Sequence, residues 1–248
     1  MKPYYDHAGI TIYHGDCRDV LSGLAFHHPR VADVIVSDPV WPNAHTDLAG
    51  AERATELFAE AAQFFPGLSS RLVVQLGCDS DPRFLAGVPA SLPFFRTAFL
   101  EYVRPHYKGR LMYTNDVAYV FGSPPPSEKG AHVMPGRFMQ TTANRAKNAH
   151  PTPRNIDHVK WLLRWYARGT VLDPFAGSGT TLLAAKTLGL PAIGIEIEEK
   201  YCAIAAKRLE QEVLCFDEKQ LDSKYDKLKA LDGRPLSFLG ECSEGTGG

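Results

Sequence analysis

The feature that most constrains the fold is an apolar run that breaks into a glycine-rich loop at residues 171–181, VLDPFAGSGTT. The start of this segment predicts a short buried strand that ends at Asp173, and a helix pattern begins near Thr180. Glycines between a strand and a helix let a ligand approach the backbone closely, where a side chain would block it. The segment is therefore typical of a nucleotide-binding α/β fold.

An acidic residue follows this loop at a sequence spacing that is typical of nucleotide-binding folds. The next predicted strand, Ala192 to Ile195, ends on Glu196, which comes 23 residues after Asp173. Doubly wound nucleotide-binding folds place an acid about 20 residues after the loop, where it accepts hydrogen bonds from a ribose. We therefore expect an adenosine-containing ligand. The alternative is a strand-turn-helix unit whose glycines serve packing alone.

Three further segments precede the loop. Residues 33–43, DVIVSDPVWPN, predict a strand that carries the tetrapeptide Asp38-Pro39-Val40-Trp41 at its carboxyl end. Residues 10–24, ITIYHGDCRDVLSGL, predict a strand with Gly15-Asp16 at its end. HPTPRN, residues 150–155, stands before a helix pattern that leads into VLDPF.

In this order the four segments resemble the S-adenosylmethionine-dependent amino-methyltransferases that modify adenine N6 or cytosine N4 of DNA, in the permuted order of their β group. The resemblance implies a glycine loop around the methionine part of S-adenosylmethionine, Glu196 on its ribose and Asp16 near its adenine. It assigns these residues to the cofactor: Asp16, Asp38, Thr152, Asp173, Phe175, Ala176, Gly177, Ser178, Gly179 and Glu196.

The tetrapeptide would supply the catalytic residues, Asp38, Pro39 and Trp41. The Asp38 carboxylate and the Pro39 carbonyl can each accept one hydrogen of an exocyclic amino group and aim its lone pair at the sulfonium methyl, so that catalysis rests on positioning and charge. Trp41 offers a face on which a flipped base can stack. The alternative is an ordinary strand end with Trp41 in the core. Val40 departs from the family, which usually has a second proline at this position. Proline has no backbone N–H, whereas Val40 provides one.

Basic residues are concentrated in one part of the sequence. The net charge is −1, yet eight basic residues and two acids lie between Val103 and Arg154. Lysine and arginine there can neutralise phosphates, and arginine or glutamine can contact base edges. We expect double-stranded DNA as the partner, a homodimer by analogy, and contacts from Arg137, Gln140, Arg145, Lys147 and Arg154. A solvated surface loop is the alternative.

Other activities fit less well. The loop lacks Gly-x-Gly-x-x-Gly, which disfavours a nicotinamide dinucleotide, and the absence of Pro-Cys disfavours cytosine C5 methylation. The resemblance favours adenine N6, because in that family a tetrapeptide that begins with Asp, as at Asp38, is usual for adenine, whereas the cytosine branch often begins with Ser. Cytosine N4, an RNA substrate and a catalytically silent nucleic-acid-binding relative stay open.

The expected fold is α/β, a doubly wound, mostly parallel, seven-stranded Rossmann-like methyltransferase sheet with one antiparallel edge strand. Strands are predicted near residues 10–14, 33–37, 71–76, 94–103, 116–121, 170–173 and 191–195, and helices at 46–65, 157–166 and 198–213.

We expect one methyltransferase domain over residues 1–215, with a short target-recognition loop at 123–149 and a partly disordered extension at 216–248. Five scattered cysteines predict reduced thiols and no zinc site. With no apolar run long enough for a membrane span, we expect a cytoplasmic protein of bacterial, archaeal or phage origin.

Overall fold

A computed structural model describes residues 2–42, 48–125, 133–140 and 154–210. Its strands are β1 Tyr5–His7, β2 Ile10–His14, β3 Val34–Ser37, β4 Arg71–Gly77, β5 Phe94–Lys108, β6 Leu111–Gly122, β7 Arg137–Met139, β8 Val171–Asp173 and β9 Ala192–Glu196. Its helices are α1 Cys17–His27, α2 Ala54–Ala62, α3 Phe65–Leu68, α4 Ile156–Tyr166, α5 Thr180–Thr187 and α6 Glu199–Glu210, with short 3-10 turns at Ala51–Arg53 and Pro82–Gly87.

Within these residues the strands form one mixed sheet in the order β1-β2-β9-β8-β3-β4-β6-β5-β7. All seven predicted strands are present, but the sheet has nine, because β1 and β7 add an edge strand on each side. Each of these two is three residues long, too short to show a period in the sequence. The α/β, mostly parallel prediction is confirmed, and the strand count was wrong.

The antiparallel strand was also misplaced. β6 runs antiparallel to both of its neighbours, β4 and β5, and so lies inside the sheet and not at its edge. The edge strand β7 pairs parallel with β5, while β1 pairs antiparallel with β2 at the opposite edge. β7 also falls within the segment 123–149 that was predicted to be a loop.

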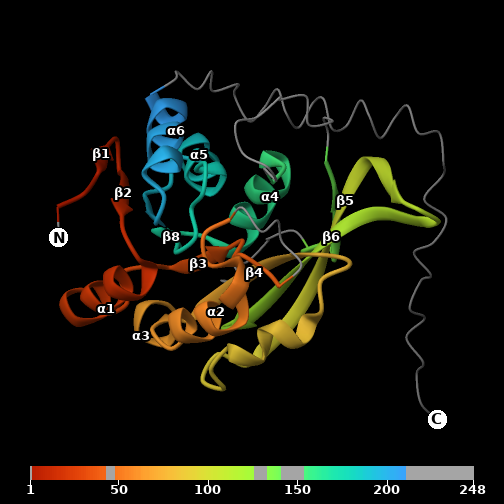
Figure 1. The fold of residues 1–248 in the computed structure, drawn as a ribbon, viewed down its shortest axis with the longest axis horizontal. Coiled ribbons are helices and arrows are strands. Elements are labelled where there is room, and N and C mark those ends of the chain that lie inside the picture. The colour runs from red at the N-terminus through yellow and green to blue at the C-terminus, as the bar shows by residue number, and fades with distance from the viewer. Residues whose placement is uncertain (1, 43–47, 126–132, 141–153, 211–248) are drawn as a thin grey trace, which may run out of the picture. The chain divides into compact units, whose positions relative to one another are not determined.

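Helices cover both faces of the sheet, with α1, α2 and α3 on one side and α4, α5 and α6 on the other (Figure 1). Alternate residues of β3 serve the two cores: Val34 and Val36 pack with the helices α4 to α6, and Ile35 packs with α1 to α3. The helix predicted at 46–65 is shorter in the structure, because α2 begins only at Ala54, after the 3-10 turn Ala51–Arg53. Helix α1 was not predicted. None of the described helices is long and apolar enough to cross a bilayer.

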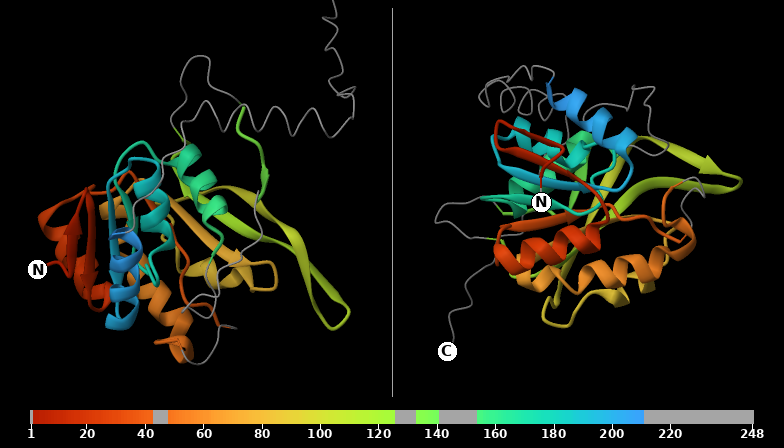
Figure 2. Two further views of the ribbon diagram at one scale, coloured as in Figure 1. Left: turned by 90° about the horizontal axis from the view of Figure 1, so that it is seen from above. Right: turned by 60° about the vertical axis from the view of Figure 1, so that its left-hand side comes forward.

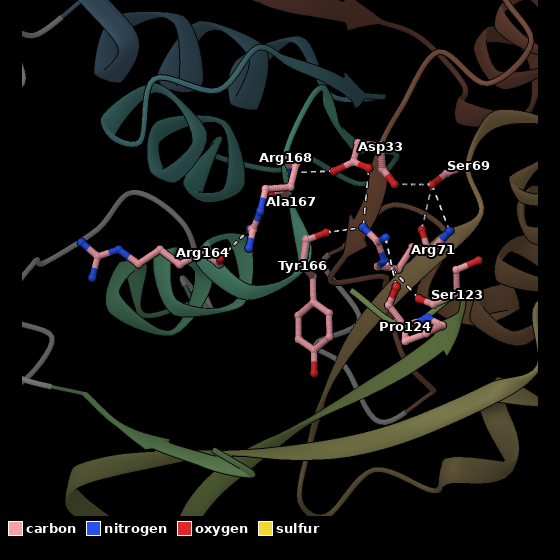
Figure 3. A network of polar contacts seen from close by, with 9 residues as sticks. All are labelled: Asp33, Ser69, Arg71, Ser123, Pro124, Arg164, Tyr166, Ala167 and Arg168. Carbon is pink, nitrogen blue, oxygen red and sulfur yellow. Dashed lines mark hydrogen bonds and ion pairs between the residues drawn. The ribbon is translucent and has the colours of Figure 1, made fainter. Parts of the chain in front are cut away.

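The buried residue Arg71 lies at the start of β4, at the amino-terminal end of the parallel strands β3 and β4, and binds several neighbouring segments there (Figure 3). The guanidinium of Arg71 donates to the carbonyls of Tyr166 at 2.6 Å, Ser123 at 3.1 Å and Pro124 at 3.3 Å, and Asp33 lies 3.5 Å away. Burial lowers the pKa of Arg71, an effect that Asp33 opposes. Because its donors are satisfied, the buried charge joins β4 to the ends of β6 and α4.

Gly122 ends β6 at a point where no side chain fits. Its φ is +86°, and a Cβ there would lie 2.0 Å from the backbone oxygen of Ser70. Gly109, at the turn of the β5–β6 hairpin, has a φ of +60°, but a Cβ at that position would meet no heavy atom within 4 Å. A side chain at Gly109 would therefore cause backbone strain alone, whereas a side chain at Gly122 would cause both strain and a steric clash.

We predict that Gly122→Ala destabilises the protein by about 3 kcal/mol or more, because strain and a backbone clash add. Gly109→Ala, the matched control, should cost only about 1 kcal/mol for the left-handed conformation. Urea unfolding of both variants checks this. Equal losses would mean that the backbone around Ser70 yields to the new side chain.

Candidate functional site

A pocket lies at the carboxyl ends of four adjacent parallel strands. In the sheet these strands follow one another as β2, β9, β8 and β3. Each brings an acid to the same edge: Asp16 after β2, Glu196 at the end of β9, Asp173 at the end of β8 and Asp38 after β3. All four acids line the pocket. In doubly wound sheets, this edge is where ligands bind.

The glycine loop is held against β9 by the acid that follows it. Both carboxylate oxygens of Glu196 accept a backbone N–H, one from Gly177 and one from Glu198, each at 2.8 Å. Burial raises the pKa of Glu196, and these two donors oppose the rise. Each oxygen has a second lone pair, so the carboxylate can still accept hydrogen bonds from a ligand. Glu196 thus also orders the loop, a role that its position in the sequence did not reveal.

Asp173 is the most deeply buried acid of the pocket, with 3% of its surface exposed. It accepts a hydrogen bond from Phe175 N at 3.1 Å and another from the Thr181 side chain. The pKa of Asp173 is raised to about 7; burial is the largest cause, the neighbouring carboxylates Asp38 and Glu196 add to it, and the two hydrogen bonds oppose it. Asp173 is therefore poised to change its charge near neutral pH.

The loop residues divide between pocket and packing. Phe175, Ala176, Gly177 and Ser178 line the pocket, whereas Gly179 does not. Gly179 begins α5 at a φ of +79°, and a Cβ there would lie 2.7 Å from that of Ala205 in α6. Its missing side chain lets α5 and α6 approach each other. For this one glycine, the structure supports the packing alternative.

Asp16 faces the pocket but already has a partner. Its side chain caps α1 by accepting from Arg18 N at 2.9 Å, and it forms an ion pair with the Arg18 guanidinium at 2.5 Å. The side-chain hydrogen bond from Arg18 lowers the pKa of Asp16, so the group is a carboxylate at neutral pH. Arg18 is in turn tied to Glu60 at 2.6 Å.

The tetrapeptide forms the other wall of the pocket, since Asp38, Pro39, Val40 and Trp41 all line it. Arg154 contacts both Asp38 and Trp41. Its Nε and Nη2 donate to the two oxygens of Asp38 at 2.8 and 2.7 Å, and its guanidinium carbon lies 5.0 Å from the centre of the Trp41 ring. Sequence alone assigned Arg154 to a nucleic-acid contact; the structure pairs it with the proposed catalytic carboxylate.

Two residues that the sequence analysis missed complete this network. Asp116 of β6 accepts from Nη1 of Arg154 at 2.6 Å, and the Tyr102 hydroxyl donates to Asp116 at 2.5 Å. Burial, and then Asp116, raise the pKa of Tyr102, which keeps it a hydrogen-bond donor. Neither residue lies in a recognisable motif, so no sequence signal could have found them.

The other predicted nucleic-acid contacts are scattered. Arg137 of β7 is exposed and lies 3.5 Å from Glu101, whereas Gln140 is buried. Thr152, Arg145 and Lys147 fall outside the described residues, as does the predicted extension at 216–248.

Part of the chain is similar to known DNA methyltransferases. Residues 107–207 match the model of the N6/N4 DNA methylases. This match covers less than half of the chain. The chain is 60% identical to the type II methyltransferase M2.DpnII of Streptococcus pneumoniae over 42 residues, and 45% identical to M.HinfI of Haemophilus influenzae over 67 residues. These matches cover 17% and 26% of this chain but only 16% and 19% of the relatives, so the chain spans less than a fifth of their length.

Solved methyltransferase structures have the same fold as this chain. M1.HpyAVI in complex with SAM superposes with a TM-score of 0.60 at 23% identity, over 81% of this chain and 100% of that one. The cytosine-N4-specific PvuII methyltransferase gives 0.64 at 17% identity, over 94% and 96%. At these identities the likeness establishes the fold alone.

We predict that Asp173 makes stability depend on pH. Its folded-state pKa of about 7 exceeds the ordinary value of 3.8, so between these values the folded chain holds a proton that the unfolded chain has lost. Stability should therefore fall as the pH rises through about 7. Asp173→Asn should weaken this dependence, which urea unfolding of both proteins at pH 5.5 and 8.5 would measure. A variant with the parent's pH dependence would show that Asp173 stays ionised in the fold.

Proposed function

We propose that this protein transfers a methyl group from S-adenosylmethionine to the exocyclic amino group of a flipped DNA base, with adenine N6 preferred. The observation that carries the proposal is that Asp38, Pro39 and Trp41 line the same pocket as the glycine loop and Glu196. A methyl donor and an amino acceptor held there would face each other across that one pocket. Positioning of this kind is what a direct displacement requires.

The residues present fit S-adenosylmethionine. Glu196 keeps acceptor capacity for a ribose, Gly177 leaves the backbone approachable, and Phe175 is partly buried beside it. The pocket is also rich in acids, which suits a ligand that carries a sulfonium and an ammonium. M1.HpyAVI, which has this fold, is known as a SAM complex. When bound, the cofactor would supply an electrophilic methyl group.

The chain's own residues would prepare the acceptor. The Asp38 carboxylate and the Pro39 carbonyl each accept one amino hydrogen, which turns the nitrogen lone pair out of the ring plane. The nitrogen gains positive charge as the new bond forms, and the carboxylate of Asp38 stabilises that charge. Trp41 stacks on the base after it leaves the duplex, at about 1–3 kcal/mol.

The β5–β6 hairpin supports a nucleic-acid partner. Figure 1 and the left view of Figure 2 show it extending beyond the helical layers. Its outer part carries the basic residues Arg104, Lys108 and Arg110, all exposed, beside exposed Tyr107 and Leu111. Cations attract phosphates, and a two-stranded ribbon can enter the major groove. We propose that this hairpin contacts DNA together with Arg137, Arg145 and Lys147 of the segment 123–149.

Adenine is preferred over cytosine because the tetrapeptide begins with Asp38. Cytosine N4 is the second candidate, favoured by the cytosine-N4-specific PvuII methyltransferase, which covers 94% of this chain. We further propose that residues 1–215 are the catalytic domain and that the protein acts in the cytoplasm.

We predict that Asp38→Ala abolishes methyl transfer while leaving cofactor affinity within about threefold, because Asp38 faces the base. Transfer from labelled S-adenosylmethionine to unmethylated plasmid DNA, followed by mass spectrometry of the nucleosides, identifies the base and the atom. Trp41→Phe, which keeps a stacking face, should retain more activity than Trp41→Ala. Full activity of Asp38→Ala would remove the tetrapeptide from the mechanism.

We predict that Glu196→Ala weakens S-adenosylmethionine binding by roughly 2–4 kcal/mol, since the ribose loses its acceptor and Gly177 N loses its own. Glu199→Ala is the matched control, because Glu199 is an exposed acid three residues on and does not line the pocket. Calorimetry on both variants measures the difference. Equal affinities for the two would place the ribose elsewhere.

A further inference from the structure

Arg154 occupies the place that the proposed function gives to the target base. Its guanidinium bonds both oxygens of Asp38 and lies over the Trp41 ring, and these are the two side chains assigned to the amino group and to the ring of the base. We propose that Arg154 acts as a surrogate for the target base: it occupies the site of the base until the base displaces it from Asp38. This inference rests on the proposed function.

The chemistry of a guanidinium supports this role. It is planar and delocalised, stacks on aromatic faces, and presents N–H donors in the plane of its π system. An adenine or cytosine offers the same two features to the site, an amino group in the plane and a π face. Arg154 therefore keeps Asp38 and Trp41 in the geometry that the base needs.

Charge requires that Arg154 leave Asp38 before the reaction. The acceptor nitrogen becomes cationic as it takes the methyl group, and the Asp38 carboxylate must stabilise that charge. A guanidinium bound to both oxygens of Asp38 would already neutralise it and would repel the cationic nitrogen. Arg154 also fills the space beside Trp41 in which the base would stack.

Asp116 gives Arg154 a partner to keep. The Arg154 side chain is 14% exposed and that of Asp116 is 9% exposed, and Nη1 of Arg154 lies 2.6 Å from Asp116, which Tyr102 also holds. When Arg154 releases Asp38, Arg154 and Asp116 remain a neutral pair, and Asp38 recovers its negative charge for the base. One cation shared between two carboxylates is thus an exchange device, not only a structural clamp.

The double variant Arg154→Met/Asp116→Asn tests the proposal. It removes the surrogate without leaving Asp116 as an unpaired buried charge, and the amide oxygen of the new asparagine can still accept from Tyr102. The single variant Asp116→Asn is the matched control, because it keeps Arg154 on Asp38. Steady-state methylation of unmethylated plasmid DNA gives KM for DNA and kcat, and calorimetry with S-adenosylmethionine confirms that each variant is folded.

A surrogate that must be displaced lowers the fraction of enzyme ready to take a base, so its removal should lower KM for DNA by about threefold or more. Asp116→Asn should show no such fall. An unchanged or higher KM in the double variant overturns the inference, a rise meaning that Arg154 binds DNA. A loss of kcat by about a hundredfold also overturns it, because Arg154 would then act in the chemical step. If the parent enzyme methylates no DNA, the proposed function itself fails, and this inference with it.

Discussion

Parallel pairing at the centre of the sheet brings the four acids that follow or end β2, β9, β8 and β3 to one edge. β9 pairs with β2 so that Glu196 lies opposite His14, and β8 pairs with β9 so that Asp173 lies opposite Gly194. Glu196 therefore reaches two residues beyond Asp173, far enough to fold back onto Gly177. A Cβ at Gly194 would lie 2.7 Å from a side-chain methyl of Leu182 and 3.0 Å from the Cβ of Ala176, so a side chain there would displace the packing of α5 and the glycine loop on β9.

Four acids within one pocket repel one another, and each is accommodated by different means. Arg18 neutralises Asp16, and Arg154 neutralises Asp38. Two backbone N–H groups hold Glu196, and burial makes Asp173 easy to protonate. Each of the four acids is therefore compensated by a cation, by backbone donors or by protonation, which limits their mutual repulsion.

The sequence could predict what depends on local pattern. The strands at the centre of the sheet are apolar and stand beside recognisable turns, so the four pocket acids were assigned from sequence alone. The three-residue strands β1 and β7 have no period to read. Gly177 and Gly179 look alike in the sequence, and only the packing of α5 on α6 separates the one that lines the pocket from the one that does not.

Arg154 marks the limit of such prediction. Its charge was evident, but its partner Asp116 becomes a neighbour only because β6 enters the sheet between β4 and β5. A contact of this kind depends on strand order, which no local spacing encodes. The assignment of Arg145, Lys147 and Thr152 stays a prediction, since these residues lie outside the described ranges.

The strand order also determines when the nascent chain can fold during synthesis. β2 is made early, yet its parallel partner β9 ends only at Glu196, and β8, which fills the space between β9 and β3, follows β3 by well over a hundred residues. Until then one side of β2 and one side of β3 are unpaired edges while the ribosome adds β4, β5 and β6. Folding of the sheet centre must therefore wait for its last strands, and a chain halted before residue 192 leaves one edge of the strand Ile10–His14 without its partner β9.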